Sequence, residues 1–189
     1  MVRGYFAVLT LVLMVGMVLA RVAMMKRKGV QAFKFGQIDK SDFLIPPFAL
    51  FYFYLVLAAA FHWPSVSTHA FFLSEAVGWL GVACCIIGLS LLLWSLISFG
   101  SSFRVGIDAD HPDQLVTTGV FAFSRNPIYV AFAVILLGEF LIFPNWILLL
   151  YLCAGIALFH RQVLREEAFS KLHYGQDYLA YCRRVRRYI

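Results

Sequence analysis

The sequence predicts an all-α integral membrane protein with about five transmembrane helices. Hydrophobic residues make up 62% of the 189 residues and charged residues only 14%, which leaves too little polar surface for a water-soluble domain. Several apolar runs reach the roughly 20 residues that a helix needs to cross a bilayer. We expect one compact bundle, with three N-terminal helices in residues 1–99 and a functional C-terminal half in residues 100–189.

Two separate apolar runs predict the first two spans. The run at 4–20 is followed by a basic cluster that starts at Arg21, and no small-residue cleavage site follows it. We therefore interpret it as a retained helix rather than a signal peptide. A second span is expected at 43–62, and Trp63-Pro64 marks its far interface.

The third expected span, residues 71–99, is longer than the roughly 20 residues that a bilayer requires. It must therefore tilt or project beyond the membrane. Gly78, Gly81 and Gly88 lie within it. Small residues of this kind allow helices to approach closely in lipid, so this helix is expected to pack tightly on a neighbour.

Two further apolar runs, at 127–143 and 145–160, are separated only by Pro144-Asn145. A tight break of this kind predicts a helical hairpin. The start of the first helix and the end of the second then lie at the same end of the hairpin. Residues 125–129 and 160–167 should therefore be neighbours.

The distribution of basic residues predicts the orientation. With five spans and the N-terminus outside, the inner side receives segments 21–42, 100–126 and 161–189. These hold 15 of the 16 Lys and Arg residues, and only Arg3 falls outside. We expect a cytosolic C-terminus and working face, as in a prokaryotic inner membrane. The last segment predicts an amphipathic helix, a break at Gly175, a short second helix and a basic tail.

The net charge of +6 is explained by this topology, and no basic stretch is interleaved with aromatics as in nucleic-acid-binding modules. A nucleic-acid partner is therefore not expected. Cys84, Cys85, Cys153 and Cys182 resemble neither a disulfide framework nor a zinc site. They are expected to pack as small buried hydrophobes, and no metal is predicted.

The stretch from Asp113 to Tyr129, DQLVTTGVFAFSRNPIY, is the most informative part of the chain. Asn126 is a favoured N-cap residue, and Pro127 suits the first turn of a helix. A helix start presents free N–H groups and a partial positive charge, which suit a carboxylate. Arg125 adds a planar cation. The alternative is a well-capped transmembrane helix with an interfacial arginine.

A second polar cluster, Arg161 to Glu167, leaves the inner end of the last span. Acidic residues near a membrane are costly to bury and tend to be paired or functional. Glu166 and Glu167 could form a solvated face paired with nearby arginines. Alternatively, one glutamate binds the hydroxyls or amine of a ligand while an arginine holds its carboxylate.

These motifs resemble those of a known family. The segments VTTGVF at 116–121 and SRNPIY at 124–129 are similar to the V-x-x-G-x-Y and R-H-P-x-Y patterns of isoprenylcysteine carboxyl methyltransferases. Glu166-Glu167 and YGQDYLAY at 174–181 resemble that family's E-E and F-G-x-x-Y-x-x-Y ending. The resemblance covers about residues 100–189 and extends to phospholipid N-methyltransferases. Two positions depart from it, because Asn126 replaces the usual His and Phe121 replaces Tyr.

The resemblance implies a membrane methyltransferase that uses S-adenosyl-L-methionine and releases S-adenosyl-L-homocysteine. The substrate would be lipophilic, either the carboxyl of a prenylcysteine-like molecule or a lipid amine, and would enter through a membrane-facing tunnel on the cytosolic side. By position, the residues that would enclose the cofactor are Gln114, Leu115, Val116, Arg125, Asn126, Pro127, Ile128, Tyr129, Glu166 and Glu167.

The catalytic residues that we predict depend on the acceptor. A carboxylate acceptor needs a cation to position it, and Arg161 or Arg165 is expected to supply it. An amine acceptor needs a base, for which Glu166 or His160 is better placed, although His160 is also typical of a helix end. Beyond these roles, methyl transfer needs mainly alignment and exclusion of water.

Two other functions stay open. Membrane sterol reductases that use NADPH resemble this family in their C-terminal half, and such enzymes need no G-x-G-x-x-G fingerprint. A non-enzymatic membrane module would carry polar residues inside its spans. Only Glu139 is clearly ionisable there, and it is expected at the outer interface.

Overall fold

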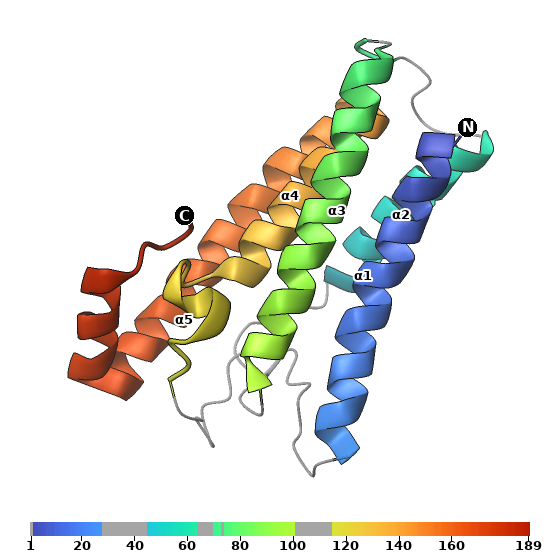
Figure 1. The fold of residues 1–189 in the computed structure, drawn as a ribbon. Coiled ribbons are helices and arrows are strands. Elements are labelled where there is room, and N and C mark those ends of the chain that lie inside the picture. The colour runs from blue at the N-terminus through green and yellow to red at the C-terminus, as the bar shows by residue number, and fades with distance from the viewer. Residues whose placement is uncertain (1, 28–44, 64–69, 73, 101–114) are drawn as a thin grey trace.

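The computed structural model describes residues 2–27, 45–63, 70–72, 74–100 and 115–189. Within these ranges the regular structure is helical, apart from a single bridge between Ser124 and Arg186. The predicted all-α class is therefore confirmed for the described residues. The elements are α1 (Val2–Arg27), α2 (Ile45–Phe61), α3 (Glu75–Ser98), the short 3-10 helix η3 (Gly119–Ala122), α4 (Pro127–Ile142) and α5 (Trp146–Arg184). Figure 1 shows the helices arranged as an elongated bundle.

Three of the described helices, α1, α3 and α5, are long and apolar enough to cross a membrane. The helices α2 and α4 are also apolar but have only 17 and 16 residues, fewer than the roughly 20 that span a bilayer without distortion. Many large apolar side chains on the outside of the bundle are exposed, including Leu50, Ile87 and Ile97. These features fit an integral membrane protein, while the number of spans and their orientation stay predictions.

The contact between α3 and α4 depends on glycines. A Cβ atom on Gly81 of α3 would lie 2.6 Å from the carbonyl oxygen of Gly138 on α4, and one on Gly88 would lie 2.6 Å from Ile135. On the α4 side, a Cβ atom on Gly138 would lie 2.6 Å from Cys85 Sγ. The predicted close packing of the glycine-containing helix is confirmed, because no larger residue fits at these positions.

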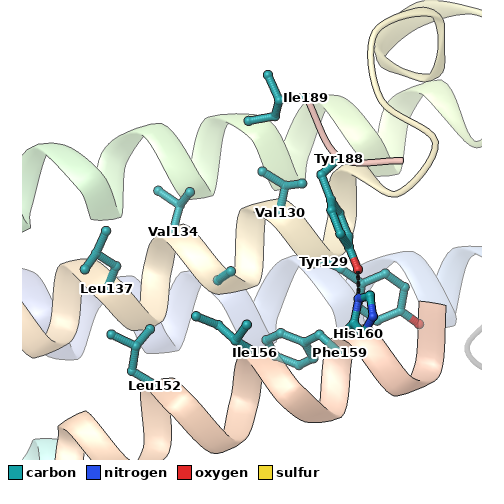
Figure 2. Close-up of a pocket in the computed structure, with 11 residues that line it drawn as sticks. Tyr129, Val130, Val134, Leu137, Leu152, Ile156, Phe159, His160, Tyr188 and Ile189 are labelled. Atoms are coloured by element: carbon teal, nitrogen blue, oxygen red, sulfur yellow. Dashed lines mark hydrogen bonds between the residues drawn. The ribbon is translucent and has the colours of Figure 1, made fainter. Parts of the chain in front are cut away.

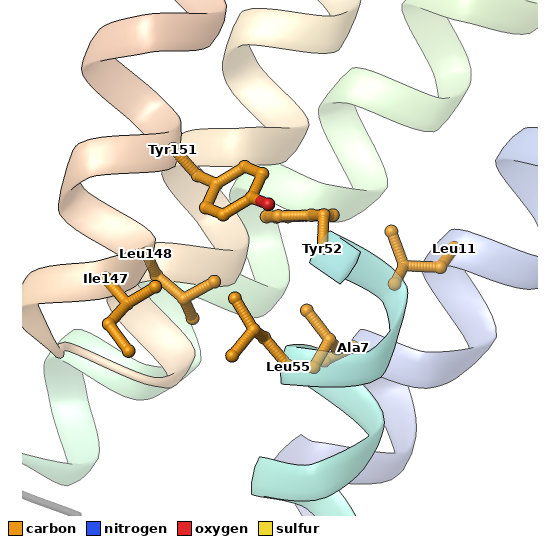
Figure 3. Packing of buried hydrophobic residues seen from close by; sticks show 8 residues of the cluster. Ala7, Leu11, Tyr52, Leu55, Ile147, Leu148 and Tyr151 are labelled. Atoms are coloured by element: carbon orange, nitrogen blue, oxygen red, sulfur yellow. The ribbon is translucent and has the colours of Figure 1, made fainter. Parts of the chain in front are cut away.

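A buried cluster of side chains fills the space between α1, α2 and α5. Ala7 and Leu11 of α1, Tyr52 and Leu55 of α2, and Leu148 of α5 belong to one buried cluster. Figure 3 shows Tyr52 facing Tyr151 of α5 across this cluster, with their ring centroids 5.1 Å apart. The cluster ties the first two helices to α5, so the N-terminal half is packed onto the C-terminal half.

The last helix changes direction at one residue. Gly175 has φ +51° and ψ −121°, a conformation that side-chain-bearing residues rarely adopt. The residues after it turn back beside the earlier part of the bundle (Figure 1). There Tyr178 and Tyr181 are buried, and the Tyr181 hydroxyl donates a 2.6 Å hydrogen bond to the carbonyl of Phe121. The predicted break at Gly175 is confirmed, and its effect is to bring the C-terminal tail to the start of α4.

Two predictions about single residues were wrong. The Glu139 side chain is completely buried rather than exposed at an interface. Cys153 is exposed rather than buried, and Cys84 and Cys182 are only partly covered, whereas Cys85 is buried as expected. In both cases the sequence shows the depth along the helix but not which face of the helix meets a neighbour.

Candidate functional site

The start of α4 is attached to the C-terminal tail. Asn126 occupies the N-cap position and Pro127 the first turn, as predicted, but the Asn126 side chain does not cap the helix. Its Nδ2 instead donates to the Arg187 carbonyl at 3.1 Å and to Glu167 Oε1 at 3.4 Å. The Arg125 amide also donates to the Arg186 carbonyl at 3.0 Å. The N-cap residue therefore joins three segments that are distant in sequence.

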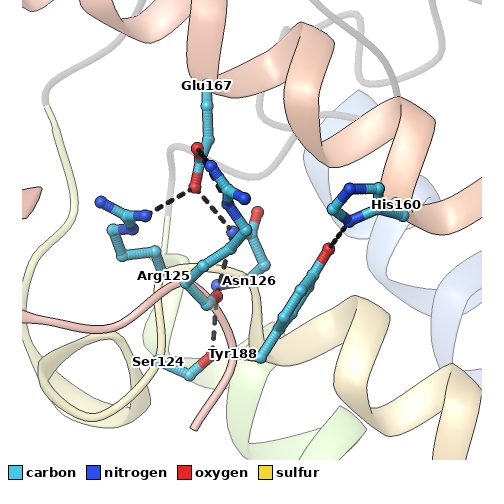
Figure 4. Close-up of polar contacts among 7 residues, drawn as sticks. Ser124, Arg125, Asn126, His160, Glu167 and Tyr188 are labelled. Atoms are coloured by element: carbon cyan, nitrogen blue, oxygen red, sulfur yellow. Dashed lines mark hydrogen bonds and ion pairs between the residues drawn. The ribbon is translucent and has the colours of Figure 1, made fainter.

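Glu167 lies at the centre of this junction and is only 4% exposed. Arg125 Nη2 lies 3.0 Å from its Oε1. Arg187 donates through Nε at 3.1 Å and Nη2 at 2.9 Å to its Oε2. Figure 4 shows the Arg125 guanidinium and the Asn126 side chain directed at this carboxylate. Two cations and the Asn126 amide thus occupy both oxygens, and Glu167 connects α5, the start of α4 and the tail.

Arg125 keeps one donor for another partner. Its side chain is 11% exposed, and its Nε is buried with no hydrogen-bond acceptor among the described residues. Buried donors are nearly always bonded in folded proteins. An unpartnered guanidinium N–H therefore marks a place where a ligand oxygen would be favourable.

Glu166, the preceding residue on α5, has a different environment. Its Oε1 accepts a 2.5 Å hydrogen bond from the Tyr129 hydroxyl and a 3.0 Å hydrogen bond from Gln162 Nε2. Both donors are neutral, and burial raises the pKa of this carboxyl, an effect that the two hydrogen bonds only partly oppose. Glu166 is thus a desolvated carboxyl whose charge is not neutralised by the cations that pair with Glu167.

An apolar groove of about 390 Å³ lies between α4 and α5. Its walls are aliphatic and aromatic side chains of both helices, and Tyr129, His160 and Tyr188 lie at one end of it (Figure 2). There His160 Nδ1 is 2.7 Å from the Tyr188 hydroxyl. The apolar residues in the wall are Val130, Ala133, Val134, Leu137, Leu152, Ile156, Phe159 and Ile189.

Tyr129 connects the groove with the polar side chain of Glu166. Its ring lines the groove and packs 5.9 Å from the ring of Phe159, while its hydroxyl bonds Glu166. The groove and Glu166 therefore share one wall. This arrangement can place a hydrophobic chain beside a water-soluble group.

The structure brings together some of the predicted site residues but not all of them. Arg125 and Asn126 contact Glu167, and Tyr129 contacts the adjacent Glu166. Leu115 packs on the cluster of Tyr178, Tyr181 and Val185, whereas Ile128 packs on Met25, Leu92, Leu96 and Ala131 inside the bundle. Pro127 is buried and Val116 partly buried, and Gln114 lies outside the described residues. Arg161 is exposed and Arg165 half-buried, and neither is among the described residues that line the groove.

Sequence reasoning missed three residues of the site. Arg187 pairs with Glu167, Tyr188 bonds His160, and Gln162 bonds Glu166. The first two lie in the segment that the sequence predicts as a basic tail. The signal that could have identified them is Gly175, because a helix that breaks there can return its end to the start of α4.

Comparisons with known proteins match this part of the chain. The profile of the phospholipid methyltransferase family matches residues 76–177, more than half of the chain. Protein-S-isoprenylcysteine O-methyltransferase of Rattus norvegicus is 30% identical over 117 residues, covering 59% of this chain and 41% of the relative. The Tribolium castaneum protein of the same name is 28% identical over 137 residues, covering 68% of this chain and 49% of the relative.

The chain therefore spans less than half the length of these relatives. The family match includes the residues of these contacts, Arg125, Asn126, Tyr129, Glu166 and Glu167. The resemblance inferred from the motifs is confirmed. The chain belongs to the phospholipid methyltransferase family.

Proposed function

We propose that this protein transfers a methyl group from S-adenosylmethionine to a lipophilic acceptor. The observation that carries the proposal is the double role of Tyr129, whose ring lines the apolar groove while its hydroxyl bonds Glu166. A water-soluble methyl donor on one side and a hydrophobic acceptor on the other would meet at this residue. Family membership and the names of the relatives support the same reaction class.

The residues at the start of α4 fit the charged part of S-adenosylmethionine. Its amino acid portion carries a carboxylate, which suits the unpartnered Nε of Arg125. Its ammonium group and ribose hydroxyls are donors, which suit Glu166, since a cation or donor beside this desolvated carboxylate would stabilise it. Glu167 is occupied by Arg125 and Arg187, so we assign ligand binding to Glu166 and a structural role to Glu167.

When bound, S-adenosylmethionine supplies an electrophilic methyl group on a sulfonium, which a lone pair of the acceptor can take without covalent help from the protein. The contribution of the chain is then binding, alignment and exclusion of water. The groove contributes to binding, because its aliphatic walls can bury a hydrocarbon chain. Such burial stabilises the complex by about 25 cal/mol for each Å² of apolar surface removed from water. A headgroup attached to that chain would lie near Tyr129, His160 and Tyr188.

The test is isothermal titration of the detergent-purified protein with S-adenosylhomocysteine. We expect micromolar binding to the wild type and at least about tenfold weaker binding to Glu166→Gln, a loss of at least about 1.4 kcal/mol. Arg125→Lys keeps a cation for Glu167 but removes the guanidinium Nε, so it should also weaken binding while the protein stays folded. Glu75→Gln, at an exposed glutamate of α3, is the matched control.

Equal affinity in the wild type, Glu166→Gln and Arg125→Lys would contradict the assignment of these residues. Absence of any binding to the folded wild type would contradict the proposed function. NADPH is titrated in parallel because a membrane reductase is the alternative activity. Binding of NADPH without S-adenosylhomocysteine would favour that alternative.

A further inference from the structure

Three arginines at the C-terminal end of the chain have exposed side chains that the candidate site does not use. Arg183 and Arg184 are the last two residues of α5, and Arg186 follows two residues later. All three are exposed. The ion pairs around Glu167 do not involve them, and their side chains have no carboxylate partner among the described residues.

The backbone after α5 directs these cations away from the bundle. Val185 has φ −122° and ψ 133°, and successive side chains of an extended segment point to opposite sides. Val185 is buried, and Arg187 pairs with Glu167. Arg184 and Arg186, on either side of Val185, therefore occupy the outer side. The tail is held to the protein by one set of side chains and presents arginines outward with the other.

The tail is fixed at the level where α4 begins. A bridge joins Arg186 to Ser124, and the Arg186 carbonyl accepts a 3.0 Å hydrogen bond from the Arg125 amide. Further along the tail, Ile189 lines the groove together with Val130, near the start of α4 (Figure 2). The end of an apolar membrane helix marks the boundary of the hydrocarbon region. The exposed arginines therefore lie beside the lipid headgroups.

An exposed aromatic pair marks the same level. Phe123, which directly precedes Ser124, is 70% exposed, and Trp94, near the end of α3, is 47% exposed. Their ring centroids are 6.0 Å apart. Aromatic rings exposed at the ends of apolar helices are typical of the membrane interface, where tryptophan is enriched. The pair is a second indication, independent of charge, that lipid headgroups surround this part of the protein.

We propose that Arg183, Arg184 and Arg186, with Trp94 and Phe123 at the same level, form a binding surface for anionic lipids. Guanidinium groups make paired hydrogen bonds with phosphate oxygens, and the two aromatic rings would lie against the adjoining part of the acyl chains. A zwitterionic lipid carries the same phosphate together with an ammonium group, which the cations would repel. The surface should therefore prefer lipids with a net negative charge. This role does not depend on methyl transfer.

The surface connects the composition of the membrane with the position of the tail. Arg187 and Tyr188 directly follow Arg186, and they bond Glu167 and His160. A lipid held by Arg186 would therefore stabilise the tail where it lies against α4 and α5. Anionic lipid should raise the midpoint of thermal unfolding more than a zwitterionic lipid does.

The experiment adds phosphatidylglycerol with brominated acyl chains to the detergent-purified protein. Bromine quenches tryptophan emission at contact, and the part of the quenching that is lost in Trp94→Phe reports on Trp94. We expect half-maximal quenching of Trp94 at a concentration at least about tenfold lower for phosphatidylglycerol than for brominated phosphatidylcholine. Added salt should reduce this preference. The triple variant Arg183→Gln/Arg184→Gln/Arg186→Gln should abolish it.

The matched control is Lys26→Gln/Arg27→Gln, which removes two exposed cations at the end of α1. This variant should keep the preference for phosphatidylglycerol. Inorganic phosphate should compete no better than sodium chloride of equal ionic strength, which separates a lipid from a free anion as the occupant. Circular dichroism shows whether each variant keeps its helices, which we expect because the substituted side chains are exposed.

Three results would overturn the proposal. The first is equal quenching of Trp94 by the two lipids in the wild type. The second is an equal loss of preference in the α1 control, which would leave only a general attraction between a basic protein and an anionic surface. The third is displacement of the lipid by inorganic phosphate beyond the effect of salt. Because none of these measurements involves methyl transfer, they leave the proposed function untouched.

Discussion

Two glutamates, both almost completely buried, lie in different parts of the bundle and are accommodated in opposite ways. Glu167 is 4% exposed, and its two oxygens meet Arg125, Arg187 and Asn126. Glu139 is 0% exposed, and neither of its oxygens has a hydrogen-bond partner among the described residues. Glu167 is therefore accommodated as a charged carboxylate, whereas the surroundings of Glu139 favour its neutral form.

An ionised carboxylate in apolar surroundings costs several kcal/mol unless it is paired and hydrogen-bonded. At Glu167 the two guanidinium groups offset that cost and fix the tail against α4. Glu139 follows Gly138, at the point where α4 touches α3. Tyr52 is a second buried group, and its hydroxyl also has no hydrogen-bond partner among the described residues. We therefore expect the neutral form of Glu139 in the folded protein.

The largest effect is expected for Glu167→Gln. This change removes the charge that pairs with Arg125 and Arg187 and leaves two buried or half-buried cations uncompensated. The free energy of unfolding should fall by about 3–5 kcal/mol. Equilibrium unfolding by addition of SDS to the detergent-purified protein measures this loss. Glu75→Gln is the control, and a loss no larger than in that control would show that the arginines do not depend on Glu167.

Much of this arrangement could be predicted from sequence. The apolar runs and the Pro144-Asn145 break indicate the helices, and Gly175 indicates the end of the long part of α5. The motifs point to Arg125 and Glu166. Each of these signals is local, because it depends on the hydropathy or backbone preference of neighbouring residues.

The remainder depends on contacts between distant segments. The pairing of Arg187 with Glu167 and of Tyr188 with His160 requires the tail to fold back, and the sequence does not show the angle of that return. The burial of Glu139 depends on which face of α4 meets α3. A run that is apolar all round gives no signal for that face.

The contact that buries Glu139 can be tested through its neighbour. In Gly138→Ala the new Cβ atom would meet Cys85 Sγ at 2.6 Å and the Gly81 carbonyl oxygen at 2.7 Å. Because α3 and α4 must then move apart, we expect a loss of about 1–3 kcal/mol in the same unfolding experiment. Gly16→Ala on α1 is the control, since a Cβ atom there would have no neighbour within 4 Å. Equal losses in both variants would show that α3 and α4 are not in close contact.

The substitution that is most damaging at Glu167 should be nearly harmless at Glu139. Glutamine has the size of the neutral acid and no charge, so Glu139→Gln should change the free energy of unfolding by less than about 1 kcal/mol. The same SDS titration measures it beside Glu167→Gln. A loss in Glu139→Gln as large as that in Glu167→Gln would show that Glu139 is ionised and has a cationic partner.

The smallest effect concerns Glu166, whose carboxyl is partly buried and whose hydrogen-bond donors among the described residues, Tyr129 and Gln162, are neutral. Burial raises its pKa above the ordinary value of 4.5, so the folded state binds its proton more tightly than the unfolded state. The stability that this group contributes is therefore complete below pH 4.5 and is lost as the pH rises through the folded-state pKa. Measured between about pH 4 and pH 8, the stability of the wild type relative to Glu166→Gln should fall with rising pH.

Saturating S-adenosylhomocysteine should reduce this slope, because an ammonium group beside Glu166 would stabilise the carboxylate. Parallel pH profiles without ligand would mean that Glu166 is as well solvated as a surface carboxylate, and then it would not be the desolvated partner that the charged end of the cofactor requires.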